Sequence, residues 1–133
     1  MGERTYNFDA LLNLKTAGAI TASAAAQVSG ANQILDVGAA RFEAVAVINV
    51  TALDVADGNE TYRVAIQGSN DATFATGVEE MASTTVTAAG KIELGFVNRK
   101  YGTQYRYLRA YTTIGGTTPS INYTAYATTV EWS

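Results

Sequence analysis

The sequence contains neither cysteine nor histidine. Without cysteine the chain has no disulfide framework, no thiolate nucleophile and no sulfur ligand for zinc. Without histidine it lacks the commonest general base near neutral pH and the commonest metal ligand, which excludes Ser-His-Asp and Cys-His catalysis and histidine-ligated zinc. Any catalysis would depend on carboxylates, lysine and tyrosine. We therefore expect a protein that is not an enzyme and that requires no cofactor.

Charge is also scarce. Charged residues make up 16% of the chain and the net charge is −3, so nothing attracts the protein to nucleic acid or to an anionic membrane surface. No stretch reaches 18 consecutive apolar residues, and the first twenty residues lack the continuous apolar core of a secretion signal. We expect neither nucleic acid nor a membrane among the partners.

The residues that are abundant favour β-structure. Hydrophobic residues reach 47% of the 133, and threonine, tyrosine and valine recur in short blocks that alternate with turn residues. This pattern predicts an all-β domain, a jelly-roll sandwich of about eight antiparallel strands. The predicted strands lie within residues 19–28, 33–37, 41–55, 60–67, 78–87, 91–97, 104–113 and 120–132. The alanine run at 24–26 fits either a strand or a helix.

The first acidic stretch is DVADGNETYR, which begins at Asp54. An EF-hand loop fails there, because Ala56 and Gly58 occupy positions that need oxygen ligands. A looser calcium site formed by Asp54, Asp57 and Glu60 is the alternative to a plain turn, which Gly58 and its neighbouring amide favour. Since neighbouring residues on a strand point to opposite faces, the pair at 79–80 is expected on a solvated edge and not as an acid/base pair.

A second segment, RKYGTQYRYLRAY at residues 99–111, mixes basic and aromatic side chains. On a strand, Tyr105, Tyr107, Arg109 and Tyr111 would share one face. Such a face could stack nucleic-acid bases, but the acidity of the chain and the lack of a glycine-aromatic RNA-binding motif favour a packing or subunit-contact strand. We expect a homo-oligomer that uses this face.

The N-terminal segment is too apolar for a free tail. Its large apolar side chains are Tyr6, Phe8, Leu11, Leu12 and Leu14. Burying each of them would be worth about 1.5–3 kcal/mol before ordering costs. We expect residues 1–18 to form an arm that docks on a partner and residues 19–133 to form the single jelly-roll domain. The alternative is that the segment packs on its own domain as an edge strand or cap, with a turn or two of helix within residues 8–14.

Three stretches also resemble a known family. They are ILDVGAARFEAVAVINVTAL at 34–53, YRVAIQGSNDATFA at 62–75 and YRYLRAYTTIGGTTPSINYTAYAT at 105–128. In this order they resemble the capsid cement, or decoration, proteins of tailed bacteriophages, in particular the Bordetella-phage type. The resemblance implies a jelly-roll homo-oligomer that binds the major capsid protein on the outside of an HK97-type shell, reinforces that shell, and is assembled in the host cytoplasm.

A second interpretation is a β-sandwich binding module, such as a carbohydrate-binding domain or a tail or adhesin component. Its mark would be exposed aromatic side chains in a cleft, and the candidates are Trp132 together with Tyr105, Tyr107 and Tyr111.

Overall fold

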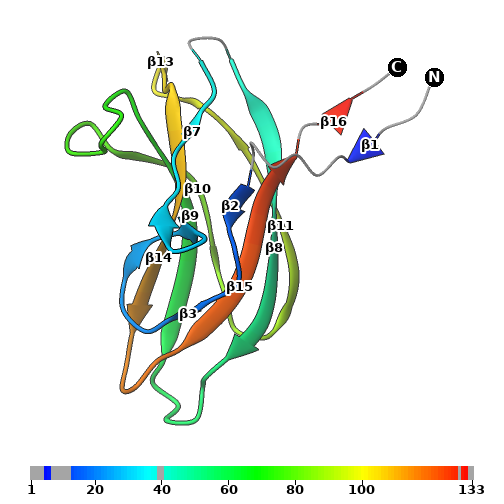
Figure 1. Ribbon diagram of the computed structural model, residues 1–133, viewed down its shortest axis with the longest axis vertical. Coiled ribbons are helices and arrows are strands. Elements are labelled where there is room, and N and C mark those ends of the chain that lie inside the picture. Colours follow the sequence, from blue (N-terminus) through cyan, green and yellow to red (C-terminus); the bar gives the residue numbers. More distant parts are fainter. Residues whose placement is uncertain (1–4, 7–12, 39–40, 129, 132–133) are drawn as a thin grey trace.

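The computed structural model describes residues 5–6, 13–38, 41–128 and 130–131. In these residues all regular structure is β-strand, arranged as two antiparallel sheets packed together as a sandwich (Figure 1). The all-β prediction is confirmed. Within the described ranges, no helix is long and apolar enough to cross a membrane. Most of the short helix considered for residues 8–14 lies outside the described residues, and its last two positions belong to a strand.

Sheet 1 is built on two long central strands, β9 and β14, which pair along their whole lengths. Its order is β10-β9-β14-β4. The short strand β7 pairs with the start of β14, and β4 pairs with a later part of the same strand. The strands are β4 (Ala24–Ala25), β7 (Leu35–Asp36), β9 (Thr61–Ser69), β10 (Glu79–Thr85) and β14 (Tyr107–Gly115).

Sheet 2 has the order β11-β8-β15-β2, and β3 pairs with the start of β15. Its strands are β2 (Asn13–Lys15), β3 (Ala19–Ile20), β8 (Glu43–Leu53), β11 (Gly90–Val97) and β15 (Ile121–Thr128). The central strand β8 is buried on both faces near its middle. Ala46 and Ile48 enter the core, and Val47, which points to the outer face, is still only 6% exposed.

Six of the predicted blocks correspond to the long strands β8, β9, β10, β11, β14 and β15, although the block at 104–113 starts three residues before β14. The first two blocks instead form short pieces. One of these, β5 (Gln27–Val28), forms a hairpin with β6 (Ala31–Asn32), which lies between the two predicted blocks. The turn residues Ser29 and Gly30 both have positive φ, as a type I′ turn requires. The alanines at 24–26 are extended, not helical.

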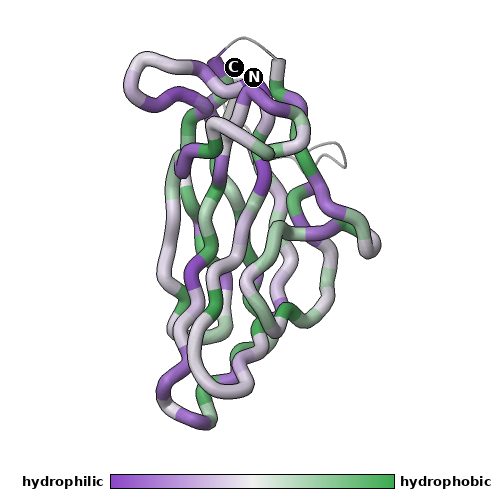
Figure 2. Tube along the Cα trace, turned by 90° about the vertical axis from the view of Figure 1, so that its left-hand side faces the viewer, coloured by the Kyte–Doolittle hydropathy of each residue, from purple (hydrophilic) through white to green (hydrophobic). Residues whose placement is uncertain are grey.

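The core lies between the sheets and follows the alternation of the strands. Inward side chains such as Ile48, Ile66, Leu108 and Ile121 are 0–1% exposed. Hydrophilic segments gather at the two ends of the sandwich, where the loops lie (Figure 2). The alternating pattern therefore buries one face of each sheet and leaves the outer faces and the loop ends available for contacts.

Two further strand pairs stand apart from the sheets. One joins β1 (Thr5–Tyr6) to β16 (Val130–Glu131), and the other is the hairpin of β12 (Arg99–Lys100) and β13 (Thr103–Gln104). Residues 13–15 are not part of a separate arm, because β2 pairs with β15 in sheet 2. Leu14 is 1% exposed in the protein's own core, so the expectation that it contacts a partner is wrong. For these residues the edge-strand alternative is correct.

Candidate interaction surface

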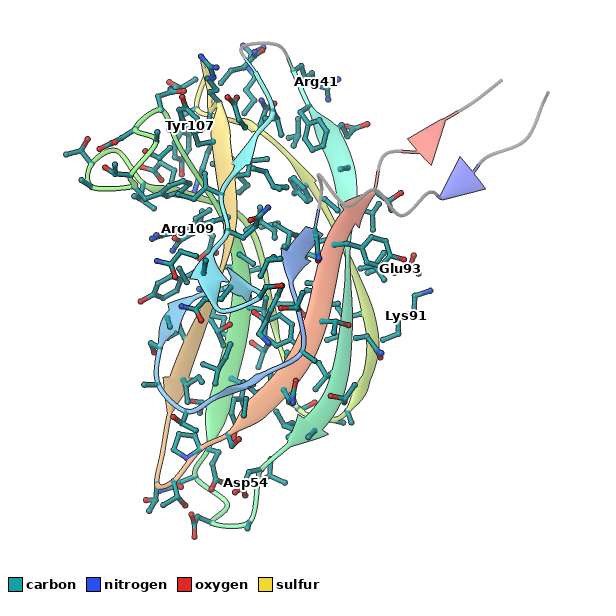
Figure 3. All side chains as sticks on the ribbon, viewed as in Figure 1. Arg41, Asp54, Lys91, Glu93, Tyr107 and Arg109 are labelled. Carbon is teal, nitrogen blue, oxygen red and sulfur yellow. The ribbon has the colours of Figure 1, made fainter. Side chains whose placement is uncertain are left out.

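The outer face of β14 carries three of the four predicted contact residues. These three residues, Tyr107, Arg109 and Tyr111, are half-buried. They alternate along the strand with the buried residues Leu108, Ala110 and Thr112. Figure 3 shows Tyr107 and Arg109 on one side of the sandwich, with Lys91 and Glu93 of β11 on the opposite side. The prediction that these three residues share a face is confirmed, whereas their binding of a partner stays a prediction.

Tyr105 does not belong to this face. It precedes β14 across a bend at Arg106, and its side chain is 9% exposed. The backbone around it is held by Asn98, whose carbonyl accepts from Tyr105 N at 2.7 Å and whose Nδ2 donates to the Tyr105 carbonyl at 2.9 Å. The strict alternation assumed from the sequence ends at this bend, which turns Tyr105 inward against Gly68 of β9.

Arg109 lies at the centre of the outer face. Its guanidinium carbon is 4.4 Å from the ring centroid of Phe74 and 5.3 Å from that of Tyr111. Its Nε donates to Oε1 of Gln67, the residue opposite it on β9, at 2.9 Å. Burial lowers the pKa of Arg109, and the aromatic ring faces offset part of the lost hydration by attracting the cation. We call Phe74, Tyr107, Arg109 and Tyr111 the arginine–aromatic surface.

Phe74 reaches this surface from the loop of residues 70–78, here called the Asp71 loop. Its φ is +57°, a region that bulky side chains rarely adopt, yet it is 7% exposed and its ring lies against Arg109. Asp71 organises the loop by accepting from Thr73 N at 2.9 Å and Thr73 Oγ1 at 2.8 Å. These hydrogen bonds hold the pKa of Asp71 below its usual value. The loop stores roughly 1–2 kcal/mol of backbone strain to place Phe74.

A second arginine, Arg106, lies over another ring of this surface. Arg106 donates from Nε and Nη2 to the two carboxylate oxygens of Asp36 at 2.8 and 2.9 Å, and its guanidinium carbon lies 5.3 Å from the ring of Tyr107. Arg106 lowers the pKa of Asp36. Asn70 of the Asp71 loop accepts from Arg106 N at 2.9 Å and donates to the Gln104 carbonyl at 3.0 Å.

Three distant parts of the chain therefore meet at one end of sheet 1. Asp36 comes from the stretch 34–53, Asn70 and Phe74 come from 62–75, and Arg106 and Arg109 come from 105–128. These are the same three stretches that carry the resemblance described above. The sequence places them 30 to 70 positions apart, so only the fold brings their side chains into contact.

The acidic stretch at 54–60 lies at the opposite end of the sandwich (Figure 3). Asp54 Oδ1 accepts from Ala56 N at 2.9 Å, Glu60 Oε2 accepts from Asp57 N at 3.1 Å, and Asp57 Oδ2 accepts from Thr118 Oγ1 at 2.8 Å. The carboxylates thus bond the turn itself and the neighbouring loop, as the turn interpretation predicts. In the described part of the chain, no three acidic residues are grouped as metal ligands would be.

Glu79 and Glu80 lie on an edge strand and are ion-paired. Glu80 pairs with Arg63 of β9, and Glu79 lies 3.6 Å from Nζ of Lys100. The expectation of a solvated edge is confirmed, because β10 is an edge strand of sheet 1 and the side chains of Glu79 and Glu80 are 44% and 34% exposed. Each carboxylate also has a cation beside it, one from the neighbouring strand and one from the β12–β13 hairpin.

Tyr101 was missed by the sequence reasoning. It lies at the tip of the β12–β13 hairpin with φ +52° and is 88% exposed, with Nζ of Lys100 5.3 Å from its ring centroid. Tyr101 and Gly102 both have positive φ, as the two central residues of a type I′ turn require. The Tyr-Gly pair between two short polar segments is therefore the sequence signal that could have predicted this hairpin tip.

The remaining predicted residues are placed only in part. Tyr6 belongs to β1, which pairs with β16, whereas Phe8, Leu11, Leu12 and Trp132 lie outside the described residues. The arm hypothesis for residues 5–12 is therefore still a prediction.

Together these observations define an antiparallel β-sandwich with a stacked arginine–aromatic surface at one end of sheet 1. Tyrosine and arginine are enriched in protein contacts, and the loops at that end are joined by hydrogen bonds. No protein-family model matches the chain, and no curated protein matches it significantly. The function is inferred from the chain's own residues.

Proposed function

We propose that this chain is a structural capsid cement, or decoration, protein of a tailed bacteriophage. In this proposal it binds the major capsid protein on the outer surface of the virion as a homo-oligomer and stabilises the shell, without catalysis and without a cofactor. The observation that supports it most is the convergence of the three family-like stretches on one side-chain cluster, in which Asp36, Asn70 and Arg106 are directly hydrogen-bonded.

The finer fold assignment, a jelly roll, is part of the proposal. We count β2 with β3 as the first principal strand and β4 with β7 as the second, and then take the six long strands in chain order. Sheet 2 then reads 1-8-3-6 and sheet 1 reads 2-7-4-5. Two interleaved Greek keys produce this alternation of successive strands between sheets, which supports the jelly roll.

The arginine–aromatic surface is the proposed contact with the major capsid protein. Phe74 is buried, the other three side chains are half-buried, and Arg109 is held by stacking and a hydrogen bond, so little conformational entropy would be lost on binding. Several copies on one shell would convert a weak single contact into firm attachment. Residues 5–12 are proposed as a second contact, with the arm ending before β2 because β2 belongs to the sheet.

Binding of purified protein to capsids prepared without it tests this function. Co-sedimentation and electron microscopy should show added density on the outer surface of the shell. Tyr107→Ala and Tyr111→Ala should lower occupancy, whereas Lys91→Ala and Glu93→Ala on the opposite face should leave it unchanged. A variant without residues 2–12 keeps β2 and should remain folded but bind less.

Capsids that take up no protein at micromolar concentration would refute the proposed function. Equal loss of binding with the variants of both faces would refute the proposed contact surface.

The alternative, a carbohydrate-binding or adhesin-type module, is favoured by one observation. Tyr101 presents an aromatic ring at a rigid hairpin tip with 88% exposure, as a sugar-stacking residue would. A glycan-binding screen distinguishes the two functions, because binding that is lost in Tyr101→Ala and retained in Tyr107→Ala would support the module and not the cement protein.

A further inference from the structure

Arg109 differs from the other bonded arginines of the described chain. Arg41 pairs with Glu43, Arg63 pairs with Glu80, and Arg106 pairs with Asp36. Arg109 has no carboxylate partner within the described residues, and its one hydrogen-bond acceptor is the neutral amide of Gln67.

Burial nevertheless affects the pKa of Arg109 more than it affects the pKa of Arg63 or Arg106. Burial is the dominant influence on its pKa, which is lowered, whereas for Arg63 and Arg106 an acidic partner dominates and raises the pKa. A desolvated cation that stacks on rings and bonds one amide is only partly compensated, because ring faces supply less than a carboxylate does. Arg109 thus lacks, among the described residues, the acidic partner that Arg63 and Arg106 have.

The guanidinium is oriented for an incoming ligand. Gln67 occupies Nε and the ring of Phe74 lies 4.4 Å from Cζ, which together fix the plane of the group. The Nη groups make no hydrogen bond within the described structure, and Arg109 projects from the outer side of sheet 1 (Figure 3). A planar fork held in this way matches the two oxygens of a carboxylate.

The acids on the two flanking strands are already bonded to other arginines, Asp36 of β7 to Arg106 and Glu80 of β10 to Arg63. Glu80 lies opposite Gln67 on the far side of β9 and is already bonded to Arg63. Gln67 therefore separates Arg109 from Glu80.

The backbone at Phe74 is an independent observation. Its positive φ is unfavourable for an aromatic residue, and it persists because Asp71 and the cation contact hold the loop. Strained residues of this kind cluster where a protein arranges side chains for binding. The loop thus places a ring under a cation that has no anion.

The geometry points to a carboxylate receptor formed by Arg109, Phe74 and Gln67, which takes an aspartate or glutamate side chain from an acidic segment of a partner protein. This inference rests on the proposed function in one respect, since that function supplies the partner. Charge complementarity commits the site to an acidic protein segment. A second copy of this chain and a phosphate group are the competing occupants.

The test is a titration of the wild-type protein, followed by the Nε–Hε resonances of its arginines in NMR spectra. The probe is the capped tripeptide acetyl-Gly-Glu-Gly-amide at constant ionic strength, and its glutamine counterpart is the matched control. The Arg109 resonance should shift and saturate, with the glutamine peptide binding about tenfold or more weakly. Arg99, which is exposed and has no carboxylate partner among the described residues, should show only a small linear shift.

Variants refine the test without being required for it. Arg109→Lys keeps the charge and loses the fork, so about tenfold weaker binding is expected. Phe74→Leu keeps the arginine and removes the ring, and it should weaken binding several-fold. Arg99→Gln makes the same charge change as Arg109→Gln outside the site and should bind like the wild type.

Three results would overturn the inference. The first is a linear Arg109 response equal to that of Arg99. The second is tighter binding of inorganic phosphate than of the glutamate peptide. The third is concentration-dependent dimerisation that Arg109→Gln abolishes, which would assign the site to a second copy. The peptide titration involves no capsid, so failure of capsid binding with successful peptide binding would refute the proposed function and not this inference.

Discussion

The hydroxyl oxygens of Tyr123 and Thr112 lie 2.6 Å apart in the space between the two sheets. Thr112 belongs to β14 of sheet 1 and Tyr123 to β15 of sheet 2, and both side chains are fully buried. This hydrogen bond thus crosses the core from one sheet to the other. Because a buried hydroxyl without a partner is costly, the bond favours the one facing of the sheets in which both hydroxyls are satisfied.

Removing one hydroxyl of this pair should destabilise the protein more than removing both. Tyr123→Phe leaves Thr112 Oγ1 buried without its partner, so we expect a loss of about 1–3 kcal/mol in the free energy of unfolding. Tyr123→Phe combined with Thr112→Val should recover part of that loss, with a coupling of about 1 kcal/mol. Urea denaturation of Tyr123→Phe, Thr112→Val and the double variant completes this double-mutant cycle. Strictly additive losses in the free energy of unfolding would contradict the interpretation.

The same tyrosine should make stability fall in alkali. Burial raises the pKa of Tyr123 to about 12 from the ordinary value of 10.0. The folded protein then holds the phenol proton more tightly than the unfolded chain does. Its contribution is complete below about pH 10 and is lost as the pH rises towards about 12, by about 3 kcal/mol in total.

Tyr123→Phe is the control for this pH effect, because it retains Lys15. Nζ of Lys15 lies 4.7 Å from the centroid of the Tyr123 ring, and burial lowers the pKa of Lys15, which acts with the opposite sign. The difference in unfolding free energy between wild type and Tyr123→Phe, measured from pH 9 to 11.5, should shrink steadily. Parallel curves would show that the phenol does not titrate differently in the folded state.

Gly68 and Gly95 form a matched pair for testing the packing behind the arginine–aromatic surface. A Cβ at Gly68 would lie 2.9 Å from Cβ of Tyr105, whereas a Cβ at Gly95 of β11 would meet nothing within 4 Å. Gly68→Ala should cost about 1–3 kcal/mol because the buried ring must shift. Gly95→Ala should be neutral or slightly stabilising, by roughly 0.5 kcal/mol. Thermal unfolding of both variants decides, and similar melting temperatures would mean that Tyr105 moves without cost.

The Asp71 loop should loosen when its carboxylate is removed or protonated. Asp71→Ala removes the acceptor of the Thr73 amide and hydroxyl, so Phe74 should leave the Arg109 guanidinium for part of the time. Since the pKa of Asp71 is lowered in the folded protein, acid should have the same effect only as the pH falls below about 3.8 and through that lowered pKa.

Amide hydrogen exchange of residues 73–76 and the Nε chemical shift of Arg109 report on this loop. Both should change in Asp71→Ala, while Asp57→Ala, at the opposite end of the sandwich, should leave them unchanged. Unaltered exchange at residues 73–76 would show that the loop is held by its other contacts.

The candidate surface was only partly predictable. The alternation around Arg109 correctly placed Tyr107 and Tyr111 beside it, because side chains two residues apart share a face of any strand. The same rule failed for Tyr105, because a bend at Arg106 interrupts the strand. That bend depends on hydrogen bonds with the side chains of Asn98 and Asn70, and no local sequence pattern indicates these bonds. The arm prediction failed for Leu14, because pairing of β2 with β15 joins residues more than a hundred positions apart.

The sequence by itself determined the all-β class, the positions of the six long strands and the burial of their alternate side chains, since these follow from local periodicity and turn residues. The tertiary structure alone decided which strands are neighbours, which termini join the sheets and which ring lies on Arg109. It also decided that this arginine contacts Phe74 and Gln67 and, among the described residues, pairs with no carboxylate. Those relationships depend on long-range pairing and on a strained loop, and neither leaves a periodic signal in the order of the residues.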